Sequence, residues 1–376
     1  MKPFLCLRTL ATVVIGLAHF GLGAADWTSG MKEGSPEFKS MGPITFGPDG
    51  ILFIADTKAA AVIALATGDT QAAKDFQPLK IEGINQKIAA LLGTSTDQIL
   101  IDDLAVNPVS RQSYLAVSRG TGPNAIPVLL KVSPNGQLSA VSMEKVRFSR
   151  TELHNAPADA LVGNGDRKRN LRMESITDVA FYQDRVLVAG LSNEEFASTL
   201  RTIPFPFPGA ATAAGTAGVE IYHGAHGQFE TRSPVRTFVP MNIGNKPTLF
   251  AAYTCTPLVE IPLSDLKAGA KVKGKTIAEL GNRNRPIDMI VYRKDGKDFL
   301  LLANSSRGIM KISTDGIEAA DSITSPVGGG GIKGQPFQTI DGWTGVDQLD
   351  KYDAAHALVL RKSEGGVQVL ESRDLP

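Results

Sequence analysis

Residues 285–312 read "RPIDMIVYRKDGKDFLLLANSSRGIMKI" and contain three short apolar runs. The charged turn "RKDGK" separates the first two runs, and the small polar turn "SSR" separates the last two. Short apolar runs bounded by turn residues indicate β-strands, because such runs are too short for an amphipathic helix. The stretch therefore predicts three consecutive antiparallel strands joined by tight turns.

The same unit recurs along the chain. Runs comparable to "FLLLAN" (299–304) occur at 51–56, 113–118, 185–190, 249–254 and 357–362, each after a turn and an earlier apolar run. A third run follows in each copy, at 61–65, 128–132, 219–223, 257–261, 308–312 and 367–371. Such repetition is typical of β-propellers. We predict an all-β, six-bladed β-propeller with long loops. A seventh blade hidden in 70–100 or 144–172 is one alternative, and an antiparallel sandwich is another.

One copy of the unit resembles a known repeat. The stretch "GPDGILFIADTKAAAVIAL" (47–65) is similar to an NHL-type repeat, in which a Pro-Asp-Gly turn precedes a strand, Ala-Asp, a short loop and another strand. The resemblance implies a propeller of the NHL and gluconolactonase-like superfamily. That superfamily includes hydrolases, binding modules and interaction domains, so the resemblance specifies an architecture and not a function.

The composition excludes some classes of partner. The 376 residues are 43% hydrophobic and 20% charged, with a formal net charge of +1. This is ordinary globular composition with ample length for a buried core. A chain so close to neutrality gives no electrostatic reason to bind nucleic acid. The run "GGGG" (328–331) lacks the Lys-Ser/Thr of a phosphate loop, and no nucleotide motif is present.

The N-terminus resembles a secretory signal. Residues 1–25 combine two basic residues, an apolar stretch and small residues before Asp26. This pattern predicts a signal peptide at 1–25, a single propeller domain at 26–376 and a periplasmic or secreted protein with no membrane association after cleavage. The mature chain then keeps one cysteine, Cys255. One cysteine excludes an internal disulfide, a CxxCH haem c attachment and an iron–sulfur site.

Propeller geometry sorts the loops into two faces. Within a blade, the turns between first and second strands and between third and fourth strands share one face. The short turns, such as "PDG" and "KDGK", are predicted there. The longer segments are predicted on the opposite face, at 70–100, 144–175, 191–217, 281–286 and 324–343. We expect a short helix in "INQKIAALLG" (84–93) and no regular structure in the proline-rich 191–217. We also expect the long segments to build a binding rim around the channel mouth.

Acidic residues recur near the start of the innermost strands. They are Asp103, Asp178, Asp288 and Asp347; the first copy has Gly42 at this point, and the fourth has no acid. Carboxylates that converge on one channel repel one another, so a cation must compensate or their pKa values must rise. Oxygen ligands favour Ca²⁺. Alternatively, the acids bond to backbone N–H groups of neighbouring blades or pair with Arg119, Arg283, Arg285 or Arg307. With Asn304, the residues we expect at the channel mouth are Asp103, Asp178, Asp288, Asp347, Arg119, Arg285, Asn304 and Arg307.

The superfamily resemblance also implies a metal set. Gluconolactonase-like members hold one catalytic metal with a Glu, two Asn and an Asp. Asp288 could correspond to that Asp, but the first blade has Gly42 in place of a Glu, and Asn304 ends a second strand. These departures weigh against lactonase chemistry.

Three other features are candidates. His223, His226 and Glu230 in "YHGAHGQFE" (222–230) have the spacing of metal ligands, yet we predict them in a Gly-rich hairpin on the face of the short turns. His154 could act as a general base or be a solvated loop residue. Cys255 is predicted to be a buried structural thiol.

Taken together, the sequence predicts an exported binding protein. Its elaborated channel face would bind a small-molecule ligand or a periplasmic protein, with a cation at the channel mouth. A metal-dependent lactonase-like hydrolase is one alternative. An accessory subunit that docks on a periplasmic enzyme is another.

Overall fold

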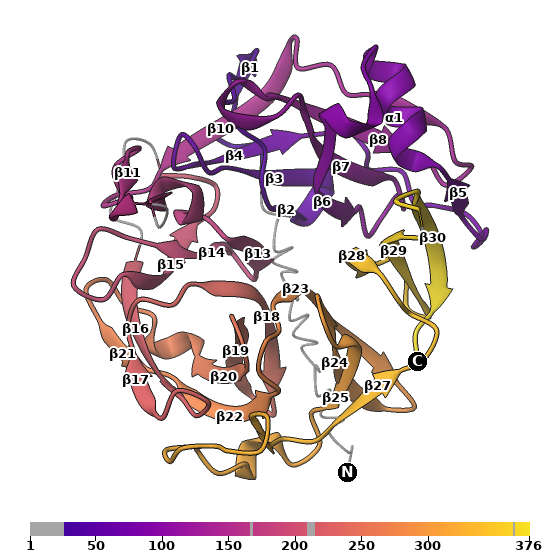
Figure 1. Ribbon diagram of the computed structural model, residues 1–376. Helices are drawn as coiled ribbons and strands as arrows, with labels where there is room; N and C mark the ends of the chain where they lie inside the picture. Colours follow the sequence, from indigo (N-terminus) through magenta and orange to yellow (C-terminus); the bar gives the residue numbers. More distant parts are fainter. Residues whose placement is uncertain (1–25, 166–167, 209–214, 364) are drawn as a thin grey trace, which may run out of the picture.

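The structure is a computed structural model that describes residues 26–165, 168–208, 215–363 and 365–376. The predicted signal peptide at 1–25 lies outside these residues. Six sheets radiate from a common centre, as Figure 1 shows. This confirms the six-bladed β-propeller. No helix in the described ranges is long and apolar enough to cross a membrane.

Each blade is named here after its innermost strand. Blade β2 contains β2 (Ile44–Phe46), β3 (Ile51–Asp56), β4 (Ala61–Ala66), β10 (Val146–Glu152) and β1 (Lys32–Gly34). Blade β6 contains β6 (Ile99–Val106), β7 (Ser113–Arg119), β8 (Ile126–Val132) and β9 (Leu138–Ala140). Blade β13 contains β13 (Asp178–Tyr182), β14 (Arg185–Leu191), β15 (Ser198–Pro204), β16 (Gly215–His223), β17 (Gln228–Glu230) and β21 (Lys271–Lys273).

The remaining three blades follow in chain order. Blade β18 contains β18 (Val235–Ile243), β19 (Lys246–Tyr253), β20 (Pro257–Pro262), β22 (Lys275–Leu280) and β26 (Ile332–Gly334). Blade β23 contains β23 (Pro286–Lys294), β24 (Lys297–Asn304), β25 (Gly308–Ser313) and β27 (Phe337–Ile340). Blade β28 contains β28 (Val346–Lys351), β29 (His356–Lys362), β30 (Gln368–Asp374) and β5 (Lys80–Glu82).

The order of the blades around the ring differs from their order along the chain. The innermost strands contact one another in the cycle β2, β13, β18, β23, β28, β6 and back to β2 (Figure 1). Blade β6 therefore lies between the first blade and the last. The chain reaches it after adding β5 to blade β28, and afterwards returns through β10 to complete blade β2. Segments 70–100 and 144–172 thus supply fourth strands to two blades and not a seventh blade.

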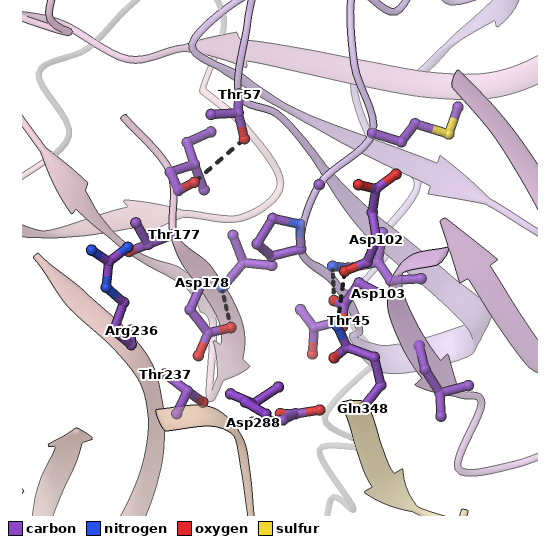
Figure 2. A pocket seen from close by; sticks show the side chains of 18 of the residues that line it. Thr45, Thr57, Asp102, Asp103, Thr177, Asp178, Arg236, Thr237, Asp288 and Gln348 are labelled. Carbon is purple, nitrogen blue, oxygen red and sulfur yellow. Dashed lines mark hydrogen bonds between the residues drawn. The ribbon is translucent and has the colours of Figure 1, made fainter. Parts of the chain in front are cut away.

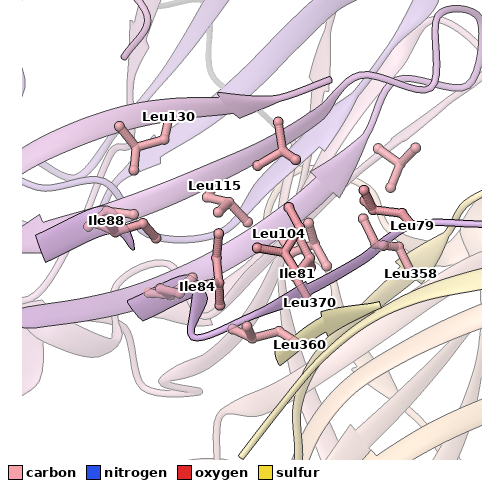
Figure 3. Close-up of a cluster of buried hydrophobic side chains, with 14 of the residues drawn as sticks. Leu79, Ile81, Ile84, Ile88, Leu104, Leu115, Leu130, Leu358, Leu360 and Leu370 are labelled. Atoms are coloured by element: carbon pink, nitrogen blue, oxygen red, sulfur yellow. The ribbon is translucent and has the colours of Figure 1, made fainter. Parts of the chain in front are cut away.

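A cluster of buried aliphatic side chains holds this closure together. Figure 3 shows leucines and isoleucines from blades β6 and β28 packed against β5 and the helix α1 (Ile84–Leu92). Ile84 and Ile88 on α1 are fully buried in the cluster, which confirms the helix predicted in 84–93. Burial of such side chains is worth about 1.5–3 kcal/mol each, so the ring is closed mainly by hydrophobic packing.

The predicted strand assignment fails in blade β13. Its third strand is β15 (Ser198–Pro204), whereas the run predicted as third, 219–223, belongs to the fourth strand, β16. Segment 191–217 is therefore not irregular throughout. Its prolines begin only at the end of β15, so the alternating "STLRTIP" is free to pair. Likewise, 324–343 is not only a loop, because it contains β26 and β27.

Because β16 is the fourth strand of its blade and not the third, the β16–β17 hairpin lies on the face opposite to the predicted one. A turn between the fourth and fifth strands lies on the same face as the loops between the second and third strands. The β16–β17 turn is thus on that loop face, where the backbone of Gly224 bonds to Val327 and that of Gly331 lies near Ala225. Conversely, the proline-rich segment after β15 begins on the opposite face. Its Phe205 donates its N–H to the carbonyl of Asp184, which lies in the turn between β13 and β14.

Candidate functional site

The central channel contains a cavity of about 1150 Å³ that all six innermost strands line. Its wall combines apolar residues with carboxylates, threonines, serines, a glutamine, two arginines and three lysines. Figure 2 shows Asp103, Asp178 and Asp288 around a common space, with Thr45, Thr237 and Gln348 beside them. The channel is therefore the candidate ligand site.

A β-bulge near the start of each innermost strand sets the height of these side chains. The register skips one residue between Ile101 and Asp103, and again at the same point of β18, β23 and β28. In β2 and β13, two consecutive residues likewise bond to a single alanine of the second strand. The residue after the skip faces the channel: Pro43, Asp103, Asp178, Thr237, Asp288 and Gln348. Bulges that re-aim a side chain are common at functional sites.

The three ring aspartates also connect neighbouring blades. Asp103 accepts the N–H of Ile44 on β2 at 2.6 Å. Asp178 accepts the N–H of Phe238 on β18 at 2.7 Å, and Asp288 accepts that of Leu349 on β28 at 2.8 Å. The inner edge of each first strand has no strand partner, so these carboxylates satisfy N–H groups that would otherwise lack a protein acceptor. This agrees with the backbone-bonding alternative from the sequence.

A fourth aspartate makes the same kind of bond deeper in the channel. Asp350 on β28 accepts the N–H of Val106 on β6 at 2.7 Å and that of Lys351 at 2.6 Å. Gln348 also links these strands, because its side-chain amide donates to the carbonyl of Asp102 at 2.9 Å. The bonds from the channel side chains thus run from one innermost strand to the next around much of the ring.

Burial raises the pKa of the ring carboxyls despite these hydrogen bonds. It raises the pKa of Asp178 to about 7 and that of Asp350 to about 6, against a partial opposing effect of the backbone N–H donors. Burial also raises the pKa of Asp103 and Asp288 well above its usual range, and repulsion from the other ring aspartates adds to the effect. Near neutral pH, the ring therefore holds carboxyls that ionise at a free-energy cost.

The mouth of the channel carries two arginines. Arg236 forms an ion pair with Glu174 at 2.9 Å. Arg285 is exposed and has no ion pair among the described residues; its backbone N–H is bonded to Ser305. Burial of part of the guanidinium and the charge of Arg236 lower the pKa of Arg285. Among these residues, no arginine forms a salt bridge with a ring aspartate, which leaves the arginine-pairing alternative without support.

The predicted mouth residues fall into two groups. Asp103, Asp178, Asp288 and Arg285 line the cavity, whereas Arg119, Asn304, Arg307 and Asp347 lie outside its lining. Asp347 sits on the skipped position and pairs with Lys362 at 3.1 Å. Asn304 is buried against Asn284, and Arg307 donates to the carbonyl of Asn282. His154 is exposed and also outside the lining.

The channel residues Thr237, Gln348 and Asp350 were not among those predicted from the sequence. For Gln348, the missing signal was the β-bulge in β28, which turns Gln348 instead of Asp347 toward the channel. The metal set implied by the gluconolactonase resemblance does not fit either. In blade β2 the ring position holds Pro43 where the resemblance implies a glutamate, and Asn304 does not reach the cavity.

Comparisons with solved structures find similarity only at low sequence identity and low TM-score. No family model and no curated protein matches the chain. Among solved structures, a soluble aldose sugar dehydrogenase from Escherichia coli is 12% identical, with 92% of this chain and 99% of that chain covered and a TM-score of 0.36. A PQQ-bound aldose sugar dehydrogenase from Streptomyces coelicolor is 11% identical, with coverages of 91% and 96% and a TM-score of 0.34. The extracellular region of plexin A4 is 10% identical, with coverages of 92% and 40% and a TM-score of 0.40.

Proposed function

We propose that this protein binds a small oxygen-rich ligand in its central channel, around a hard divalent cation held by Asp103, Asp178 and Asp288. The observation that carries the proposal is the carboxylate ring itself. Asp103, Asp178 and Asp288 face one cavity that Asp102, Asp350 and Glu174 also line. Burial opposes the ionisation of the three ring aspartates, and no basic side chain of the described residues pairs with them. A bound cation would remove the cost of ionising them.

The donor set selects the kind of ion. Asp178 and Asp288 each accept one backbone N–H on each oxygen, and Asp103 accepts at least one. A carboxylate oxygen has a second lone pair that remains available to a metal. Thr237 and Gln348 add neutral oxygens to the same wall. A site with oxygen donors alone favours Ca²⁺ over zinc or copper.

The mouth suggests the chemistry of the ligand. Arg236 is already neutralised by Glu174, but Arg285 presents to the same cavity a guanidinium that forms no ion pair with the described residues. A small organic anion that also carries hydroxyl groups could contact Arg285 and complete the coordination of the cation. The residues at 1–25 support the further proposal that this binding takes place after export, which N-terminal sequencing of the mature protein would check.

Calcium titration with a matched pair of variants tests the proposal. The protein is stripped with a chelator, dialysed, and titrated with Ca²⁺ by calorimetry and thermal denaturation. We expect one Ca²⁺ per chain in the unmodified protein and in Asp347→Asn, whose side chain lies outside the cavity. Asp288→Asn should weaken binding by at least about tenfold, because it removes one charged ligand. Equal Ca²⁺ affinities in Asp288→Asn and the unmodified protein would contradict the proposal, as would no binding at all.

A further inference from the structure

A second group of metal-type ligands lies on the loop face, outside the central cavity. His223 ends β16, His226 is in the β16–β17 turn, and Cys255 is in the loop between β19 and β20 of the next blade. One ligand atom of each residue lies within 4.8 Å of those of the other two. None of the three lines the central cavity. The fold therefore brings the thiol of Cys255 close to two imidazoles that lie about thirty residues earlier in the sequence.

The ring of the buried His223 makes no hydrogen bond within the part of the chain that the structure describes. His223 is 2% exposed, and neither ring nitrogen has a hydrogen-bond partner there. Its Nδ1 is 3.2 Å from Glu230 Oε1, but the contact lacks hydrogen-bond geometry. Leaving a buried polar group unsatisfied costs about 1–3 kcal/mol. Coordination of one ring nitrogen to an ion would remove this cost for that nitrogen. After a small rotation of the ring, the other nitrogen of His223 could donate a hydrogen bond to Glu230.

The neighbouring carboxylate orients the second histidine. Glu230 Oε1 is 2.6 Å from Nδ1 of His226, and Ser233 donates its hydroxyl to the other oxygen of Glu230. A carboxylate that holds one imidazole nitrogen fixes the ring and leaves the opposite nitrogen for a metal, as in many zinc sites. For His226, this is Nε2. The side chain of His226 is 50% exposed, so an ion can reach the group from solvent.

The thiol is held in an unfavourable backbone conformation. Cys255 has a φ of 82°, a region that residues other than glycine rarely adopt. Its N–H donates to the carbonyl of Asn284 at 2.8 Å, which keeps the loop in place. Such conformations cost about 1–3 kcal/mol and are concentrated at ligand-binding sites. Here the conformation places the thiol beside the hairpin of the neighbouring blade.

We propose that His223, His226 and Cys255 bind one zinc-type transition-metal ion, which ties the outer hairpin of blade β13 to the β19–β20 loop of blade β18. Two nitrogens and one sulfur favour Zn²⁺ over Ca²⁺. Bonds of about 2.0 Å to nitrogen and 2.3 Å to sulfur place tetrahedral ligand atoms roughly 3.3–3.6 Å apart. Binding therefore requires the ligand atoms to move up to about 1.5 Å closer together than the 4.8 Å limit, and rotation of the half-exposed His226 side chain can supply this movement. The fourth position is open to water or to an external ligand.

Cobalt is the probe for this site, because Co²⁺ bound to a thiolate gives a near-ultraviolet charge-transfer band. The chelator-treated protein, kept under a non-thiol reductant, is titrated with Co²⁺ and then with Zn²⁺. We expect the band to saturate at one Co²⁺ per chain and to disappear as Zn²⁺ displaces the cobalt. Saturating Zn²⁺ should also raise the melting temperature.

Three variants locate the site. Cys255→Ser should lose the charge-transfer band, and His226→Gln should weaken Co²⁺ binding by at least about tenfold. Because His226 is half exposed, its replacement should leave the fold intact. His154→Gln, an exposed histidine elsewhere on the loop face, should bind as the unmodified protein does. Lack of a band in the unmodified protein overturns the proposal, and so does a Zn²⁺ affinity that neither Cys255→Ser nor His226→Gln changes. Asp178→Asn should keep the band, which separates this site from the channel.

Discussion

The charge on Asp178 should make the protein less stable as the pH rises, and Asp178→Asn should remove the part of the pH dependence that this carboxyl causes. Burial raises the pKa of Asp178 from 3.8 to about 7 in the folded chain. The folded protein therefore holds a proton that the unfolded chain releases between these two values. Stability falls with pH wherever the folded state binds more protons. The contribution of Asp178 is fully present below about pH 4 and lost by about pH 7.

The size of the effect follows from the two pKa values. A change from 3.8 to about 7 corresponds to about 4 kcal/mol, since one pH unit is worth 1.36 kcal/mol. An asparagine amide in this place would be neutral at every pH, like the protonated carboxyl. The free energy of unfolding of Asp178→Asn, relative to the unmodified protein, should therefore rise by about 4 kcal/mol from pH 4 to pH 8. For a chain of this length, that is about 5 °C in melting temperature.

The assay is thermal and urea denaturation of chelator-treated protein at pH 4 to 8. Asp178→Asn is compared with the unmodified protein and with Asp341→Asn, which replaces an exposed acid. The introduced amide has one acceptor oxygen where the carboxylate has two, so it can satisfy only one of the N–H groups of Val179 and Phe238. This loss lowers stability by a roughly constant amount at every pH. The change of the difference with pH is therefore the informative quantity.

Parallel curves for Asp178→Asn and the unmodified protein would refute the reasoning, because Asp178 would then ionise in the folded chain without a cost. Asp341→Asn is the control for the loss of a carboxyl in general, because its side chain is exposed and lies outside the cavity lining. Added Ca²⁺ should flatten the curve of the unmodified protein above pH 6.

Two further predictions concern the fold that supports the channel. Leu370→Ala should lower the free energy of unfolding by about 2–5 kcal/mol, because Leu370 is fully buried in the closure cluster. Leu91→Ala, 45% exposed on α1, should change it by less than about 1 kcal/mol in the same urea titration; equal effects would contradict the role of the cluster. Gly190→Ala should cost at least about 2–3 kcal/mol, because its Cβ would lie 2.1 Å from the carbonyl oxygen of Ser175, just before Asp178. Gly328→Ala, with no atom within 4 Å, is the control, and a tolerated Gly190→Ala would show that this connection can shift freely.

Local patterns in the sequence were enough to predict the blades but not how they connect. Alternating runs and turn residues identify the first two strands of every blade, because these signals are local. The pairings of β5 with β30 and of β10 with β4 join segments far apart in the chain, and no local pattern encodes them. The strand β15 was missed because the prolines that follow it dominated the interpretation of 191–217. That one error placed the His223–His226 hairpin on the wrong face and hid its proximity to Cys255.

The candidate site was predicted in part for a similar reason. Asp103, Asp178 and Asp288 could be found because each stands out against an apolar run. Gln348 could not, because the bulge that turns it inward replaces Asp347 at the ring position. A bulge depends on how two strands pair, so the residue it selects is not visible in one strand alone.

The blade-to-blade bonds alone do not explain why the ring residues are acids. Gln348 occupies the ring position of β28 and bonds across to β6 through a neutral amide. Thr237 and Pro43 occupy it in two other blades, which close against their neighbours without a charge there. These three residues carry no charge at the ring position, whereas burial raises the pKa of Asp178 to about 7 and so opposes its ionisation near neutral pH. The backbone bonds account for where the carboxylates point, but their charge needs a different reason. The cation that we propose in the channel would supply that reason, because it would turn the repulsion among these carboxylates into binding energy.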